Sequence, residues 1–310
     1  TRLDLAHWLT REDHPLVSRV RVNHLWKMLL GTGLVRTAGD FGTQGELPSH
    51  PELLDWLAHR FVASGWDTKA LIHDIVVSAT YRQQSIFRKE TTPGDPQNRL
   101  LSRSPRFRLS AEEIRDMALA SSGQLSRVLG GPSVRPFQPP NYFAANSGRR
   151  WAMDAGEKSR RRALYTYIQR TAPFPAHLIF DAPSRQICTA TRPRTNTPLQ
   201  ALVLMNDPLF LKAAGALAHK TLTRESETVE QRARFLFRSV LSRSPSRDEM
   251  DLLLLTVREQ HEVYRRNPAD AEAFLRAAGF SKPDLPKAEL AAWINLAHVV
   301  LNLDEAITRE

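Results

Sequence analysis

Three arginines and an asparagine lie close together in one stretch of the sequence, at Arg185, Arg192, Arg194 and Asn196. A Thr-Pro pair follows at once, and this pair is typical of the first positions of a helix. Free backbone N–H groups and the helix dipole at such a position add to guanidinium charge, so the cluster has the chemistry of an anion site. These four residues are therefore candidate ligand-binding residues.

The same arginines have a structural alternative. Asp181 and Asp207 lie in the same stretch, and arginine pairs readily with carboxylates through two hydrogen bonds. Buried ion pairs of this kind tie a fold together and perturb pKa values without any ligand. The structural role is the interpretation we favour for this cluster.

A second polar group surrounds the Gly-rich loop of residues 36–50. It adds Asp40 and His50 to the candidate ligand-binding residues, because loops held on rigid helices often carry function. Turn formation explains Asp40 without a ligand, and a capping box explains Ser49 with Glu52. We again favour the structural account.

The usual signatures of catalysis are absent from the sequence. It has no complete dinucleotide fingerprint, Walker-type loop, G-x-S-x-G elbow or zincin pair of histidines. The single cysteine, Cys188, excludes an internal disulfide and a Cys-based metal cluster, and no C-x-x-C-H run could attach haem. We predict no catalytic residue, metal site or cofactor in this chain, and whether it is an enzyme stays open.

One pair, Cys188 with His177, has the residue types of a nucleophile and its base. Nothing in the sequence fixes their separation. A lone cysteine is more often a small buried hydrophobe, which is the role we expect for Cys188.

The chain is basic, with 43 Lys and Arg against 33 Asp and Glu and a formal net charge of +10. Such a charge suggests an anionic partner, namely nucleic acid, a membrane surface or an acidic polymer. The densest run, Arg160–Arg162, is equally typical of a solvated helix face. Nucleic acid is not the partner we favour, and no apolar run reaches the roughly 18 residues of a membrane-spanning helix.

Hydrophobic periodicity predicts a predominantly all-α fold with long Pro- and Gly-rich connections. Capping boxes are expected at Ser49, Ser110 and Ser246, and Asp67 is a further N-cap. In the helix after Pro198 we expect four apolar residues to be buried, Leu199, Leu202, Val203 and Met205. The expected helices cover residues 15–30, 51–65, 67–79, 110–125, 209–222, 229–241, 250–265 and 286–303, and a further helix begins at Pro198. Residues 159–170 fit a helix or a strand.

Residues 131–158 are rich in Pro, Gly, Asn and aromatic side chains and show no clean period. We place a boundary there, between an N-terminal helical lobe (1–130) and a C-terminal helical lobe (131–310); one continuous domain is the alternative. A small β-hairpin is a further option within residues 131–170. The polar residues 82–109 are expected to form a loop or linker.

Residues 185–210, RQICTATRPRTNTPLQALVLMNDPLF, resemble the signature of a C-terminal domain of unknown function from large planctomycete proteins. Those proteins often carry a cytochrome-c-like domain upstream. Residues 23–58, 108–119 and 161–171 agree with the same family in order. The chain departs from it at Gly39, where an acidic residue is usual, and at residues 304–306, where Asp-Glu-Ala replaces Asn-Glu-Phe. We call residues 181–212 the signature segment.

The resemblance implies an exported parent protein, periplasmic or at the cell surface, whose upstream domains, a haem domain among them, are partners. It carries over no activity and no catalytic residue. We favour a helical interaction or scaffold domain that binds partner domains or an anionic ligand. One alternative is an enzyme acting on acidic or sulfated polysaccharide, supported if a deep pocket joined the arginines to Asp40 or His50. The other is a nucleic-acid-binding protein, which requires a continuous basic stripe with exposed aromatic side chains.

Overall fold

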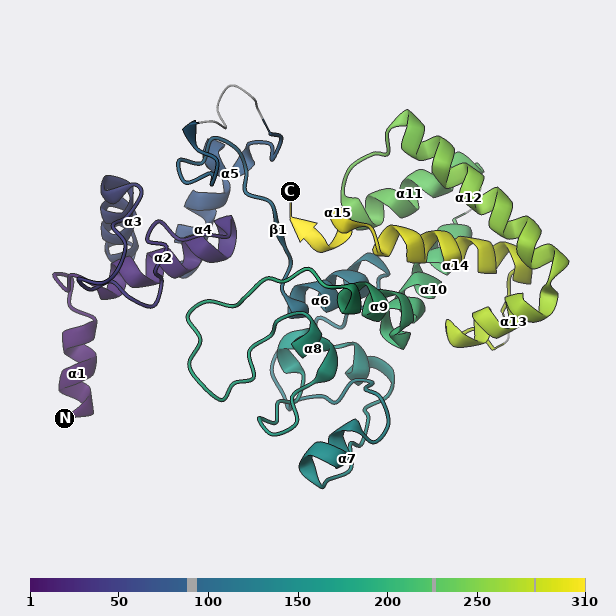
Figure 1. The fold of residues 1–310 in the computed structure, drawn as a ribbon, viewed down its shortest axis with the longest axis horizontal. Helices are drawn as coiled ribbons and strands as arrows, with labels where there is room; N and C mark the ends of the chain where they lie inside the picture. Colours follow the sequence, from purple (N-terminus) through teal and green to yellow (C-terminus); the bar gives the residue numbers. More distant parts are fainter. Residues whose placement is uncertain (88–93, 225–226, 282, 310) are drawn as a thin grey trace. The chain divides into compact units, whose positions relative to one another are not determined.

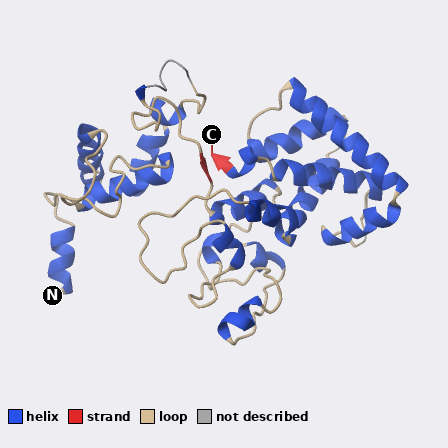
Figure 2. Ribbon diagram, in the orientation of Figure 1, coloured by secondary structure: helices blue, strands red, loops and turns tan. Residues whose placement is uncertain are grey.

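The computed structural model describes residues 1–87, 94–224, 227–281 and 283–309, and helices dominate it (Figures 1 and 2). This confirms the predicted all-α class. The described elements, in chain order, are α1 (Arg2–Leu9), α2 (Val17–Leu30), α3 (Pro51–Ala63), α4 (Thr68–Val76), α5 (Ala79–Arg82), β1 (Phe107–Arg108), α6 (Ala111–Ser121), α7 (Tyr142–Ser147), the 3-10 helices η2 (Gly156–Arg160) and η3 (Ala163–Tyr165), α8 (Pro175–Ile179), α9 (Pro198–Asn206), α10 (Pro208–Leu222), α11 (Val229–Leu241), α12 (Arg247–Arg266), α13 (Pro268–Ala277), α14 (Lys287–Leu301), α15 (Asp304–Ile307) and β2 (Thr308–Arg309).

The chain divides into two compact units. Unit 1 holds residues 1–107 together with Arg309, and unit 2 holds residues 108–308. The boundary expected between an N-terminal lobe (1–130) and a C-terminal lobe (131–310) stays a prediction. The expected loop at residues 82–109 lies in unit 1 except for its last two residues, and residues 88–93 of it are outside the described part of the chain.

The core of unit 1 forms between α2, α3 and α4. The buried positions of α2 include Val22, Trp26 and Leu30, which recur at the spacing of one helix face. Asn23 lies on the same face and is fully buried, and its side-chain amide exchanges two hydrogen bonds of 2.9 Å with the backbone of Val35. That pairing explains why position 33 is a glycine, because a Cβ there would lie 2.7 Å from the Asn23 amide.

The core of unit 2 is built on α10 and α14, which pack closely along their lengths. Small side chains permit the close approach, Ala213, Ala214 and Gly215 on α10 and Ala291 on α14 among them. Trp293 of α14 is 2% exposed and joins the same cluster. Helices α11, α12 and α13 complete this core, and α6, the first helix of unit 2, also packs against it.

Helix capping follows the sequence closely, with one exception. The predicted boxes at Ser110 and Ser246 are present, and Asp67 caps α4 by accepting from the backbone N–H groups of its first turn. The box predicted at Ser49 is wrong. His50 is the N-cap residue of α3, and the Ser49 hydroxyl lies 3.0 Å from His50 Nδ1 instead of bonding the helix.

The β-hairpin considered for residues 131–170 is also wrong. All these residues are described, and they contain 3-10 turns and the short helix α7 but no strand. The two isolated bridges in this part of the chain, Ser126 with Arg161 and Val134 with Thr166, are parallel, whereas a hairpin is antiparallel. Prolines at positions 132, 136, 139 and 140 remove the N–H donors that a strand ladder requires.

Within the described residues, no single helix is long and apolar enough to cross a membrane. Only α9 and α10 taken together meet that requirement by length and composition, and the pair is bent by 53°. Most of α10 is buried in the core of unit 2, and core helices also meet such a requirement.

Substitution of Gly215 tests the close packing on α10. An added Cβ would lie 2.8 Å from the Phe280 ring and 3.0 Å from the Ala278 carbonyl oxygen. Although Ala favours helix, we expect Gly215→Ala to lower the free energy of unfolding by about 1–3 kcal/mol through overpacking. Chemical denaturation measures the change. Gly94→Ala is the control, because its Cβ would meet no atom within 4 Å; an equal loss in both variants contradicts the packing argument.

Candidate functional site

The signature segment begins with a clamp at Asp181. Its carboxylate accepts hydrogen bonds from the Thr195 backbone N–H at 2.8 Å and from the Thr195 hydroxyl, and it pairs with Arg108. The Arg108 and Asp181 side chains are only 10% and 13% exposed. Arg108 also donates to the carbonyls of Thr195 and Phe180, so the pair is hydrogen-bonded on several sides. The clamp closes the ends of the loop formed by residues 182–194.

The predicted arginines of this loop take different positions. Arg192 donates to Glu112 of α6 at 2.8 Å, and the two side chains are 37% and 24% exposed. Burial lowers the pKa of Arg194, and the charge of Glu113 opposes that effect. Arg185 is exposed and has a left-handed backbone (φ 65°), and Asn196 is exposed as well. Arg192 therefore has a structural partner, while Arg185 and Asn196 face solvent.

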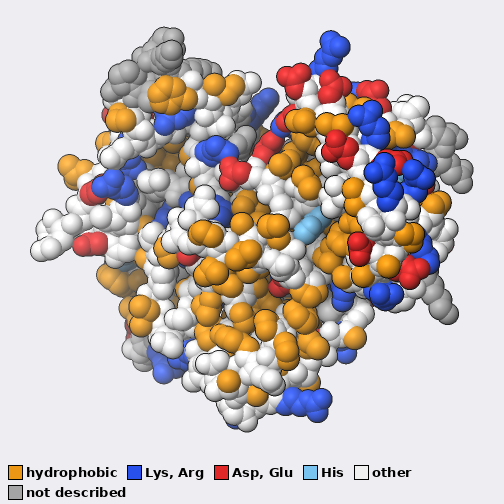
Figure 3. All heavy atoms as spheres, turned by 45° about the vertical axis from the view of Figure 1, so that its right-hand side comes forward, with side chains coloured by type: hydrophobic (Ala, Val, Ile, Leu, Met, Phe, Trp, Pro, Cys, Tyr) orange, Lys and Arg blue, Asp and Glu red, His pale blue; other side chains and the backbone are white. Residues whose placement is uncertain are grey.

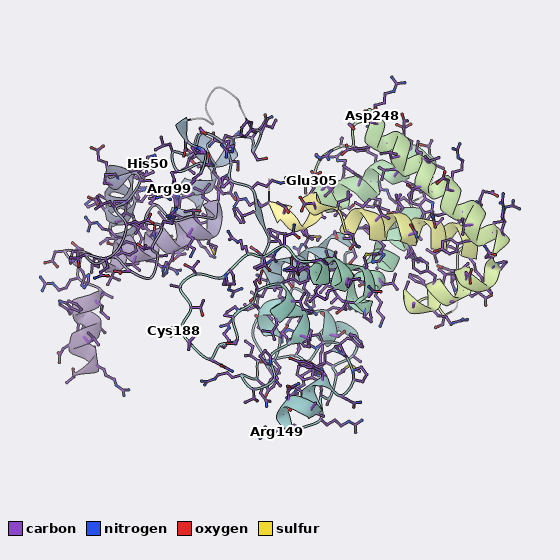
Figure 4. The ribbon with its side chains drawn as sticks, in the orientation of Figure 1. His50, Arg99, Arg149, Cys188, Asp248 and Glu305 are labelled. Atoms are coloured by element: carbon purple, nitrogen blue, oxygen red, sulfur yellow. The ribbon has the colours of Figure 1, made fainter. Side chains whose placement is uncertain are left out.

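Cys188 lies at the outer bend of the loop, away from the helices of unit 2 (Figure 4). It is exposed, as is its neighbour Ile187. The expectation that Cys188 is a small buried hydrophobe is therefore wrong. Among the described residues no hydrogen bond joins it to His177, which packs against Phe174 with ring centroids 4.9 Å apart. The sequence could not show this, because the irregular connection between α8 and Cys188 fixes no distance from Cys188 to His177.

Helix α9 exposes most of the apolar side chains that the sequence placed in the core. Leu199, Leu202 and Met205 are 61%, 52% and 57% exposed, so their predicted burial is wrong, and Val203 is half-buried. Gln200 and Leu204 are the buried residues of this helix. Figure 3 shows apolar side chains gathered over a large part of one face of the molecule.

Asp40 and His50 belong to unit 1, so they are described apart from the arginines. The Asp40 carboxylate accepts the Gly42 backbone N–H at 2.8 Å, and its carbonyl accepts the Thr37 hydroxyl at 2.9 Å. His50 contacts Ser49 and begins α3. Both residues thus have local structural roles in the loop of residues 36–50, and their predicted ligand-binding role stays a prediction.

Several titratable groups with shifted pKa values gather around a small cavity in unit 2. The cavity is lined by residues of α6, α8 and α10, including Arg115, His177 and Asp207, together with four phenylalanines. Burial lowers the pKa of His177 to about 4; Glu112 opposes this, while Arg115 and other arginines reinforce it. Burial also lowers the pKa of Arg115.

The carboxylates near this cavity respond in two ways. Burial raises the pKa of Asp207, against the hydrogen bond from the Leu209 N–H and the charge of Arg115. Burial is the largest single influence on Glu112 and works to raise its pKa. The hydrogen bond from Arg192, a backbone hydrogen bond and the Arg192 charge together outweigh burial, so the pKa is lowered. Glu112 therefore connects α6 to the loop formed by residues 182–194 through its pair with Arg192.

Sequence reasoning missed Arg115 and Arg161. Arg115 donates to the carbonyls of Arg161 and Ser159 at 2.8 and 2.7 Å, and Arg161 in turn donates to carbonyls in residues 128–132. The run Arg160–Arg162 is therefore not simply a solvated face, since Arg161 is buried over the Tyr165 ring. A signal was present for Arg115, which shares the buried face of α6 with Ala111 and Ala118.

A larger groove of about 620 Å³ lies elsewhere in unit 2, between α11, α12 and α14. Asp251, Arg258, His261 and Trp293 are among the residues that line it. None of the predicted site residues lines this groove. Among the residues that the structure describes, no group of three or more His, Cys, Asp or Glu side chains is placed to hold a metal ion.

These features define a predominantly α-helical protein whose signature segment combines an anchored loop with a helix that exposes apolar side chains. The chain belongs to the PSD1 family, described as proteins of unknown function (DUF1553), whose family model matches residues 1–257. No curated protein and no solved structure shows significant similarity to it. The family match agrees with the domain of unknown function that the signature motif suggested.

Two arginine variants separate anchoring from surface pairing. Arg108→Met leaves the largely buried Asp181 carboxylate without its cation, so we expect the free energy of unfolding to fall by about 3–5 kcal/mol. Arg192→Met breaks a more exposed pair and should cost about 1 kcal/mol or less. Urea denaturation at one salt concentration gives both values. If the Arg192 variant is as unstable as the Arg108 variant, Arg192 is an anchor of the fold.

The His177 environment predicts a pH dependence of stability. Between pH 6.5, the ordinary pKa, and about 4, the unfolded chain binds a proton that folded His177 does not. The free energy of unfolding should therefore fall as the pH falls across this window, by up to about 1.4 kcal/mol per pH unit, and this loss ends below pH 4. Denaturation curves of wild type and His177→Gln at several pH values isolate the contribution; parallel curves contradict it.

Proposed function

We propose that this chain is an interaction domain that docks a partner protein through the signature segment. The observation that carries the proposal is the exposure of Leu199, Leu202 and Met205 on one short helix. Contiguous exposed apolar side chains on a folded protein typically mark a surface that another molecule covers. Three residues at spacings of three share one side of α9, which makes them a candidate docking face.

The core of unit 2 holds this face in place. Gln200, on the buried side of α9, donates to the Ile179 carbonyl at 2.9 Å and to the Thr195 hydroxyl at 3.1 Å. The Leu204 carbonyl oxygen lies 3.1 Å from His298 Nε2 of α14. A helix fixed in this way loses little conformational entropy on binding, which favours recognition.

Charge favours a partner with carboxylates around an apolar centre. The exposed Arg185 lies in the loop that leads to α9, and the whole chain carries a net charge of +10. Complementary charges at the rim of an interface steer association and fix orientation, while the apolar centre supplies most of the affinity. Arg192 is already paired with Glu112, so it contributes less to such a rim.

The resemblance of the signature motif suggests which partner this could be. We infer that the partner is an upstream domain of the same exported parent protein, which in related proteins is often accompanied by a cytochrome-c-like domain. This gives the helical domain a scaffolding role within one polypeptide. An anionic ligand at the loop arginines is the second form of the same hypothesis.

Leu202→Glu tests the docking face. We expect the variant to bind the separately expressed upstream part of the parent protein at least about tenfold more weakly, because it introduces a negative charge into an apolar contact facing carboxylates. Its stability should change by less than about 0.5 kcal/mol, since Leu202 is exposed. Leu252→Glu is the matched control, because that leucine is 63% exposed on α12, outside the signature segment. Calorimetry measures the affinities.

If both variants weaken the binding equally, or if neither variant weakens it, the result contradicts the docking face. A parallel titration with a sulfated glycan and with duplex DNA, at several salt concentrations, tests the other two functions. Binding of the glycan that Arg185→Ala abolishes would favour a polysaccharide ligand. Binding of DNA with a steep salt dependence would favour nucleic acid.

A further inference from the structure

Two of the residues that line the cavity of unit 2 carry a buried polar atom without a hydrogen-bond partner among the described residues. The cavity measures about 30 Å³, and most of its wall is apolar, with Phe174, Phe180 and Phe210 among the lining side chains. Within the described residues, Arg115 Nε and His177 Nε2 are buried and have no hydrogen-bond partner. Both side chains line this same cavity, and Asp207 adds a carboxylate to it.

Arg115 is the more constrained of the two. The residue is 5% exposed, and its two terminal nitrogens donate to the carbonyls of Arg161 and Ser159. Its Nε is therefore the one guanidinium nitrogen that has no hydrogen-bond partner among the described residues. Buried polar atoms in folded proteins nearly always have a hydrogen-bond partner, so two such atoms on one small cavity indicate a shared one.

We propose that this cavity is a binding site for one water molecule, held by Arg115 Nε, His177 Nε2 and the Asp207 carboxylate. A buried water needs roughly 10–15 Å³ and typically makes about three hydrogen bonds, and the cavity supplies both. Arg115 Nε–H donates to the water oxygen. The water donates one hydrogen to Asp207 and the other to His177 Nε2. A drug-sized ligand needs a pocket of at least roughly 300 Å³ and does not fit.

Charge favours a neutral molecule over an anion. The positive charge of Arg115 is offset by Asp116 and Asp207, both of which interact with it electrostatically. Burial favours the neutral form of His177, so the imidazole adds no second positive charge near neutral pH. An anion in the cavity would lie beside the Asp207 carboxylate, which repels it.

The water connects α6, α8 and α10, three helices next to or within the signature segment. Arg115 lies on α6, His177 lies on α8 immediately before the segment, and Asp207 caps α10 within it. The Asp207 carboxylate already accepts the Leu209 N–H at 2.8 Å, so its orientation is fixed. The bound water therefore links α8, which precedes the signature segment, to the start of α10.

Crystallography of the full chain tests the site directly. A single density peak should lie within about 3.2 Å of Arg115 Nε, His177 Nε2 and an Asp207 carboxylate oxygen. An empty cavity overturns the proposal. An anomalous peak at this position in bromide-soaked crystals also overturns it, because the occupant is then an anion.

Two variants test the site in solution at pH 7.5. His177→Phe keeps a ring against Phe174 but removes Nε2, so it should lower Tm by about 2–4 °C if that nitrogen bonds a water. If the nitrogen has no partner, the same substitution removes an unsatisfied polar atom and raises Tm. His177→Gln retains a polar group and should lower Tm less than His177→Phe. A rise in Tm for His177→Phe overturns the proposal.

Discussion

The ion pair between Asp181 and Arg108 is the interaction on which the geometry of the signature segment depends. Removing two charges from water is costly, and the protein offsets that cost by saturating both groups with hydrogen bonds. Asp181 accepts from Thr195 as well as from Arg108, while Arg108 also donates to the carbonyls of Phe180 and Thr195. The loop of residues 182–194 can therefore extend into solvent, while α9, which follows it, begins at a fixed place on the core of unit 2.

The same use of arginine recurs through the irregular part of unit 2. Residues 126–166 contain little regular structure, so their backbone carbonyls need partners from elsewhere. Arg115 and Arg161 supply them, the first to Ser159 and Arg161 and the second to residues 128, 130 and 132. Some of the arginines thus connect segments inside the protein. Their positive charge is therefore no evidence for nucleic-acid binding.

The predominantly helical class and most helix positions could be predicted, because periodicity and capping are local properties; the boxes at Ser110 and Ser246 show this. The burial of α9 could not be predicted. Its residues are apolar on nearly every side, so no pattern indicates that Leu204 faces the core and Leu202 does not. The cavity lined by Arg115, His177 and Asp207 could not be predicted either, since α6, α8 and α10 meet only through tertiary packing. His177 entered the sequence argument only as a partner for Cys188.

The position of Cys188 has a practical consequence. It is the single cysteine of the chain, it is exposed, and it lies at the outer bend of a loop whose ends are anchored. A thiol-reactive spin label or fluorophore would therefore attach at one defined place in the native sequence, without engineered residues. Its mobility would report directly on motion of the loop, and changes in its signal would show when another molecule approaches that part of the surface.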